Sequence, residues 1–141
     1  MNDLGAGSGP IAPPKRTGFQ DRSGLVVAEK RGEWMHGHFD ITPEHLNRQG
    51  VVHGGVYSTM LDAMMASAGA HVDGADTHQP VMTVSMTVNF TGRADSGRVA
   101  LTSRVIGRMK RSFTAEAHAH GPDGALLAHA LGSFRFAPKP A

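Results

Sequence analysis

Apolar and polar residues alternate through the second half of the chain and predict long β-strands there. The predicted strands cover residues 80–91, 98–106 and 112–120. In the last of them, Phe113 and every second residue through Ala119 are apolar, with polar residues between them. A two-residue period places these apolar side chains on one face of a sheet. A turn over 121–124 and a strand over 125–136 extend the antiparallel run.

The other predicted strands also have two distinct faces. One face of the strand over 80–91 carries Val84, Met86 and Val88, and one face of the strand over 98–106 carries Val99, Leu101, Ser103 and Val105. Two shorter strands are predicted earlier, over 25–30 and 33–41, with Met35 and Phe39 on one face of the second. The apolar faces are the ones we expect to meet the core.

One long helix is predicted over residues 54–72, where few residues break the helical pattern. Asp73 and Gly74 are expected to end it, because Gly commonly follows the last turn of a helix. Since one helix can cover only one face of so large a sheet, we expect the sheet to wrap around the helix. The edges of that sheet stay uncovered, so we also expect the chain to form oligomers.

Composition narrows the class of protein. The chain has 141 residues, which suits one domain. Gly and Pro are concentrated near the start, so we expect a disordered or irregular arm over 1–23, a folded domain over 24–137 and a tail over 138–141. The absence of Cys excludes disulfides, cysteine nucleophiles and zinc sites built on thiolates.

Charge and hydropathy argue against two kinds of partner. A net charge of +2 is too small to favour nucleic acid. We find neither a secretion signal nor an apolar stretch long enough to span a bilayer. We therefore expect a cytoplasmic protein that binds neither nucleic acid nor membranes.

The candidate chemistry is concentrated in residues 47–70. A polar loop leads into His53-Gly54-Gly55, which opens the predicted helix. The first N–H groups of a helix have no intrahelical acceptor and carry the positive end of its dipole, so they suit an anion or a developing oxyanion. Asp62 shares a helical stripe with small and hydroxyl residues, namely Gly55, Ser58, Thr59, Ala66 and Gly69. Such a stripe favours close packing beside the carboxylate, and a solvent-facing Asp is the alternative.

This stretch resembles a known family. The string formed by Asn47, Gly50, His53-Gly54-Gly55 and Asp62 is similar to the signature of hotdog-fold acyl-CoA thioesterases of the phenylacetate-pathway, or PaaI-like, type. The resemblance covers residues 24–137 and is strongest over 43–91. It implies an α+β hotdog fold, in which an antiparallel sheet wraps around one long central helix, and a dimer that often doubles to a tetramer.

The resemblance also implies a reaction. An acyl-CoA with an aromatic or a short to medium-chain acyl group would be hydrolysed to the acid and free CoA, without metal or organic cofactor. Asp62 would act as base or nucleophile, and the N–H groups of Gly54 and Gly55 would polarise the carbonyl. Asp62 lies eight positions after Gly54, which is about 12 Å along a helix. One helix therefore cannot bring both groups to one carbonyl, whereas two antiparallel helices in a dimer can.

Further roles follow from the resemblance. Asn47 would position the water or the thioester, and Thr83 would orient the water. His53 would hold the loop or hydrogen-bond near the thioester, and a loop-ordering His without chemical role stays open.

Basic residues are candidates for binding the phosphates of CoA. Arg108, Lys110 and Arg111 lie in the turn between two predicted strands, and Arg93 is a weaker candidate. An ordinary solvated hairpin turn is the alternative.

Two pairs of histidines share a strand face, His36 with His38 and His118 with His120. A solvated face is favoured over a zinc site for each pair, because no third ligand is evident.

Two rival hypotheses for the function remain. A dehydratase or hydratase of acyl thioesters on the same fold would pair His53 with Asp62. A non-catalytic acyl-CoA binding protein that senses its ligand is the rival from another class. The sequence shows no DNA-binding helix pair, which argues against such a sensor.

Overall fold

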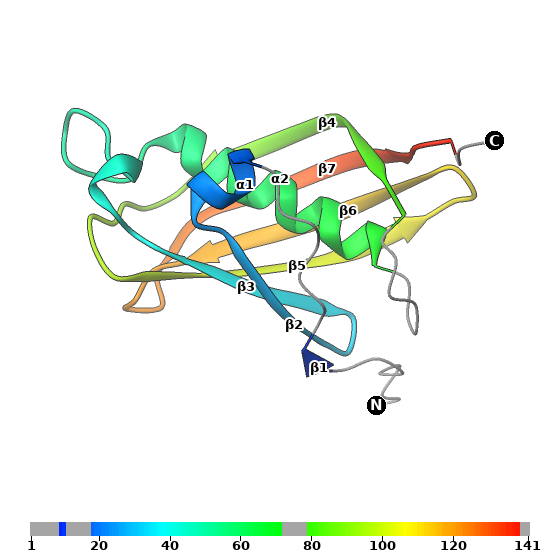
Figure 1. Cartoon of the computed structure of the whole chain (residues 1–141), viewed down its shortest axis with the longest axis horizontal. Coiled ribbons are helices and arrows are strands. Elements are labelled where there is room, and N and C mark those ends of the chain that lie inside the picture. The colour runs from blue at the N-terminus through cyan, green and yellow to red at the C-terminus, as the bar shows by residue number, and fades with distance from the viewer. Residues whose placement is uncertain (1–8, 11–17, 72–78, 139–141) are drawn as a thin grey trace.

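A computed structural model describes residues 9–10, 18–71 and 79–138, and there one antiparallel sheet wraps around helix α2 (Gly54–Ala70) (Figure 1). The seven strands of this described sheet are β1 (Gly9–Pro10), β2 (Val26–Arg31), β3 (Trp34–Asp40), β4 (Val81–Phe90), β5 (Arg98–Arg108), β6 (Ser112–His120) and β7 (Leu126–Phe136). Their order across the sheet is β1-β2-β3-β5-β6-β7-β4. A short helix, α1 (Gly18–Ser23), and a 3-10 turn, η1 (Pro43–His45), complete the described elements.

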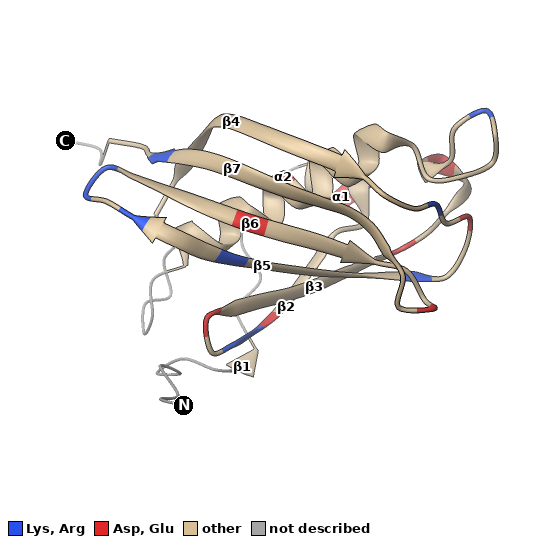
Figure 2. Cartoon of the chain, turned by 180° about the vertical axis from the view of Figure 1, so that it is seen from behind, with Lys and Arg blue, Asp and Glu red and all other residues tan. Residues whose placement is uncertain are grey.

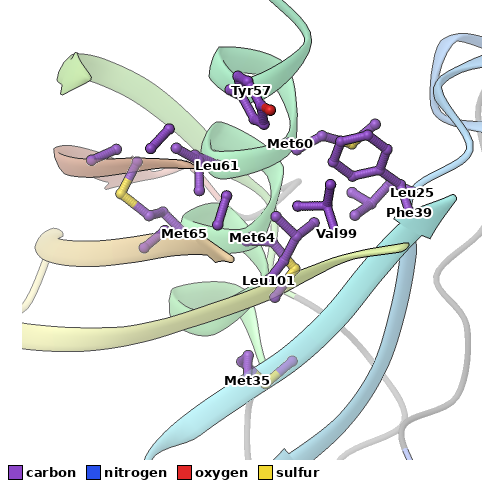
Figure 3. Packing of buried hydrophobic residues seen from close by; sticks show 14 of the residues in the cluster. Leu25, Met35, Phe39, Tyr57, Met60, Leu61, Met64, Met65, Val99 and Leu101 are labelled. Carbon is purple, nitrogen blue, oxygen red and sulfur yellow. The ribbon is translucent and has the colours of Figure 1, made fainter. Parts of the chain in front are cut away.

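The core lies between α2 and the concave face of the sheet. Figure 3 shows side chains of α2 packed against residues of β3 and β5. The buried α2 residues are Tyr57, Met60, Leu61, Met64, Met65, Gly69 and Ala70. Ser103, fully buried on β5, donates its hydroxyl proton to the Met64 carbonyl oxygen over 2.7 Å, which satisfies its polar group inside the core.

Most of the predicted strand faces are confirmed. Met35 and Phe39 of β3 are buried, as are Phe113 and Ala119 of β6. The prediction for β4 is wrong at Val84, which is 65% exposed. The pairing of β4 with β7 shifts register between Thr83 and Ser85, so the alternation breaks at the residue between them.

One prediction about the helix needs correction. Gly69, at the far end of the stripe of small residues that includes Asp62, is buried, and a Cβ there would lie 1.9 Å from Cζ of Phe113. Helix α2 ends at Ala70, two residues earlier than predicted. The predicted stop at Asp73 and Gly74 lies outside the described residues.

The expected irregular arm over 1–23 contains regular structure where it is described. Strand β1 pairs with the end of β2. Helix α1 is held by His45, whose Nε2 donates to the Ser23 carbonyl oxygen over 2.7 Å and whose Nδ1 accepts from the Thr42 N–H over 3.0 Å. This buried imidazole fixes α1 beside η1, a tertiary contact that local composition does not reveal.

Among the described residues, no helix is both long enough and apolar enough to cross a bilayer.

Candidate active site

His53 organises the start of α2. Its Nδ1 accepts a hydrogen bond from the Gly55 N–H over 2.8 Å, which makes it the N-cap of the helix. Its carbonyl oxygen accepts from the Val56 N–H over 2.9 Å. Of the two N–H groups predicted to polarise a carbonyl, the one on Gly55 is therefore already used. Within the described part of the chain the Gly54 N–H has no acceptor, so it is the donor that remains for an oxyanion.

Phe90, at the end of β4, packs directly on the helix start. A Cβ added to Gly54 would lie 3.3 Å from Cε1 of the Phe90 ring, so this glycine lets the aromatic ring approach the backbone. Phe90 is 54% exposed. Sequence reasoning missed Phe90, whose only signal was an apolar residue that closes a predicted strand.

The structure brings Asp62 and Thr83 together. The Thr83 hydroxyl donates to Oδ1 of Asp62 over 2.6 Å, and this bond links α2 to β4 across 21 positions of sequence. A hydrogen bond to a charged acceptor of this length fixes the orientation of the carboxylate. No group in the described part of the chain is bonded to the second carboxylate oxygen, which stays available for a water or a substrate.

Asp62 and the helix start do not meet within one protomer. Asp62 lies eight residues after Gly54 on the same continuous helix. That spacing corresponds to about 12 Å along the axis. A single chain therefore presents two half-sites: a carboxylate with its hydroxyl, and an N–H donor with its aromatic cover.

Asn47 is occupied in its own loop. Its side-chain oxygen accepts from the Gln49 N–H over 2.9 Å and from the Val51 N–H over 3.3 Å. Its backbone N–H donates to the Val51 carbonyl oxygen, and Gly50 has the left-handed φ of 76° that closes this turn. The geometry makes Asn47 an organiser of the loop that leads into α2, and it brings no contact with Asp62.

The predicted basic residues separate into three places. Arg108 donates to the Gly69 carbonyl oxygen over 3.4 Å and lies 4.9 Å from the Phe136 ring centroid, so it caps the end of α2. Lys110 and Arg111 line a cleft of about 480 Å³. Arg93 follows the C-terminal end of β4. The carbonyl oxygen of its neighbour Ala94 accepts a hydrogen bond from the Val52 N–H.

A second cleft, of about 520 Å³, opens beside the start of α2. Its apolar lining includes Phe19 of α1 together with Val56 and Met60 of α2. His53 and Gly55 line it too, so the cleft reaches the helix start. Helix α1 contributes a wall that the sequence did not predict.

Histidines gather on the convex face of the sheet. His118 and His129 lie opposite each other on β6 and β7, with ring centroids 6.2 Å apart. Burial lowers the pKa of His118 below its usual value, and the neighbouring His120, His129 and Arg104 lower it further, whereas Glu116 raises it. Among the described residues no group of three or more His, Asp or Glu is placed to hold a metal ion.

Comparison with known proteins places the chain in a family. The model of the family described as the thioesterase superfamily matches residues 49–128, more than half of the chain. No curated protein matches the chain. Solved structures do match, at identities that show the fold alone.

Three of these structures illustrate the likeness. A conserved protein from Pseudomonas aeruginosa has a TM-score of 0.78 and 24% identity, and the match covers 88% of this chain and 100% of that one. The PaaI protein from the phenylacetic acid degradation operon of E. coli has a TM-score of 0.77 and 14% identity, covering 88% and 87%. Thioesterase superfamily member 2 from zebrafish has a TM-score of 0.75 and 20% identity, covering 87% and 89%. The expected hotdog fold is confirmed, and the chain belongs to the thioesterase superfamily.

Proposed function

We propose that this protein is an acyl-CoA thioesterase that hydrolyses an acyl-CoA to the free acid and CoA. The hydrogen bond from Thr83 to Asp62 carries the proposal, because it orients a half-buried carboxylate in a member of the thioesterase superfamily. A carboxylate held in this way can act as a general base or a nucleophile.

The active site is shared between two protomers of a homodimer. Strand β4 is at the edge of the described sheet, and its exposed apolar residues are Met82, Val84 and Phe90. Long apolar edge strands are rarely left open to solvent, because their backbone groups pair readily with another strand. Pairing of two β4 strands about a two-fold axis continues the sheet and sets the two α2 helices antiparallel. Asp62 of one protomer then faces Gly54 of the other.

The reaction follows from this arrangement. A water molecule gives a proton to Asp62 and adds to the thioester carbonyl, while the Gly54 N–H of the other protomer stabilises the oxyanion. The C–S bond then breaks, and the proton held by Asp62 passes to the leaving thiolate. If Asp62 attacks the carbonyl directly, water hydrolyses the resulting anhydride and the products are the same.

The cleft at the helix start is the candidate acyl pocket. Its volume of about 520 Å³ and its lining by Phe19, Val56 and Met60 suit an aromatic or a short to medium-chain acyl group. Because Phe19 belongs to α1, the short N-terminal helix would help select the acyl group.

Hydration or dehydration of an acyl thioester is favoured less by this geometry. That chemistry needs a His paired with Asp62, whereas Asp62 is bonded to Thr83 and His53 caps the helix. A non-catalytic binder would have the same clefts without turnover, so a measurement of hydrolysis decides between a thioesterase and a binder.

Thiol release from a panel of acyl-CoA esters tests the proposal. We expect the wild type to release CoA, and Asp62→Asn to lose activity by about a hundredfold or more, because the amide can neither take a proton nor attack. Ser67→Ala, a change on the same helix away from both half-sites, is the control. Full activity in Asp62→Asn would remove this carboxylate from the mechanism, and absence of release from every ester would leave the hydratase and the binder.

A further inference from the structure

A basic cleft lies at the end of the sheet where the β5–β6 hairpin, the end of β7 and the start of β4 meet. It has a volume of about 480 Å³, and three cations line it: Lys110, Arg111 and Arg135. Figure 2 shows the corresponding basic segments at the hairpin tip and at the neighbouring end of β7. The remaining lining residues are Gln79, Met82, Phe136, Ala137 and Pro138.

Backbone hydrogen bonds fix the segments that carry these cations. The Phe136 N–H donates to the Arg111 carbonyl oxygen over 3.0 Å, and the Met109 N–H donates to the Ser112 carbonyl oxygen over 2.8 Å. Arg135 lies opposite Ser112 on one side and opposite Met82 on the other. The backbone of the cleft is therefore ordered before a ligand binds, so binding does not have to order these segments.

Within the described part of the chain, no carboxylate neutralises the charge of the cleft. Elsewhere on the sheet arginines are paired, as Arg98 is with Asp40 and Arg104 is with Glu116. Among the described residues no carboxylate pairs with Lys110, Arg111 or Arg135, and none lines the cleft. Clustered cations beside an apolar surface suit a ligand that joins phosphate groups to an apolar or aromatic part.

We propose that Arg135, with Lys110 and Arg111, binds the phosphate groups of the CoA moiety. The inference rests on the proposed function and adds Arg135, which no sequence pattern indicated, to the substrate-binding residues. Met82 lines the cleft and directly precedes Thr83, the partner of Asp62. The hairpin tip lies two strands away from β4, or about 10 Å at the usual strand spacing. The long pantetheine arm of CoA spans such a separation between thioester and phosphates.

Two substrates with the same acyl group separate binding of the phosphates from chemistry. One is the acyl-CoA, and the other is the N-acetylcysteamine thioester, which lacks every phosphate. We expect Arg135→Gln and the double variant Lys110→Gln/Arg111→Gln to raise KM for the acyl-CoA by about tenfold or more, with kcat nearly unchanged. For the N-acetylcysteamine thioester, kcat/KM should stay within about twofold. Arg31→Gln, an exposed arginine on β2, is the matched control.

Two results would overturn the inference. One is an unchanged KM for the acyl-CoA in both variants, and the other is an equal loss of kcat/KM on both thioesters, which would indicate a structural role. If the wild type hydrolyses neither thioester, the proposed function fails, and calorimetric titration with CoA itself then tests the cleft. Binding of CoA that weakens about tenfold in Arg135→Gln, and not in Arg31→Gln, would support it, and binding unaffected by Arg135→Gln would refute it.

Discussion

Thr83 contributes one hydroxyl to the site, and that hydroxyl is bonded to the carboxylate of Asp62. Thr83→Val keeps the shape of the side chain and removes the donor. A hydrogen bond to a charged group contributes about 1.5–3 kcal/mol, so we expect kcat/KM to fall about ten- to a hundredfold. Steady-state hydrolysis of the best acyl-CoA measures this. Thr83→Ser, which keeps the hydroxyl, should retain most of the activity, and equal losses in both variants would contradict the assigned contact.

Single residues differ in how well the sequence predicts them. Asp62 and Thr83 were predicted as separate site residues, and the structure shows a hydrogen bond between them. That contact depends on how α2 packs against β4, which the sequence of neither element specifies. The side-chain oxygen of Asn47 is occupied by backbone donors of its own loop, a local competition that a motif does not reveal. Arg135 could be found only from the register of β7 against β6, which depends on the turn between them.

At the scale of elements, α2 fits the sheet closely near its C-terminal end. Gly69→Ala would place a Cβ 1.9 Å from the Phe113 ring, which stacks on Phe134. Overpacking of this kind costs about 1–3 kcal/mol, so the free energy of unfolding should fall by that amount or more. Gly107→Ala is the matched control, because no described atom beyond the adjacent residues lies within 4 Å of the added Cβ. Urea denaturation at fixed protein concentration compares them, and equal stability of the two variants would contradict the packing.

The convex face of β6 should make stability depend on pH. Burial lowers the pKa of His118 in the folded state, so the unfolded chain takes up a proton more readily. The contribution of His118 to the free energy of unfolding is complete above about pH 6.5, the usual pKa of an unfolded His. It is lost as the pH falls through the pKa of His118 in the folded state. His118→Gln should therefore reduce the decline in unfolding free energy between pH 7.5 and pH 5.5, relative to His38→Gln. An identical decline in both variants would show that His118 is not the group responsible.

The strand faces could be predicted from local sequence patterns. The features that differ from the prediction arise from contacts between elements distant in sequence. The faces of β3, β5 and β6 were predictable because a two-residue period needs no knowledge of neighbours. The register shift in β4 was not, since it arises from pairing with β7. Helix α1 is short and has no buried residue of its own, and its contact with His45 gives it a fixed place.

At the scale of the whole molecule, the presence of one helix and one large sheet predicted that the sheet wraps around the helix. It did not predict the order of the strands in that sheet. Strand β5 pairs with β3, and β4 is displaced to the far edge beside β7. Alternation identifies a strand's faces and leaves its neighbours undetermined, so the apolar edge could not be assigned to β4 in advance. That edge is the basis for the proposed dimer and for dividing the active site between two chains.

Mixed dimers test this division most directly. Asp62→Asn removes the carboxylate, and Gly54→Pro removes the donor N–H at the first helical position, where proline is tolerated and the preceding His53 is already extended. Gly54→Ala, which adds a side chain against Phe90 and keeps the N–H, is the matched control and should retain much more activity than Gly54→Pro.

The decisive sample is a dimer with one Asp62→Asn chain and one Gly54→Pro chain, isolated through two different affinity tags. In a shared arrangement both defects fall in one site, and the other site has an intact Asp62 and an intact Gly54. Thiol release should then reach about half the wild-type rate, although each parent homodimer is nearly inactive. A mixed dimer no more active than its parents would contradict the shared site.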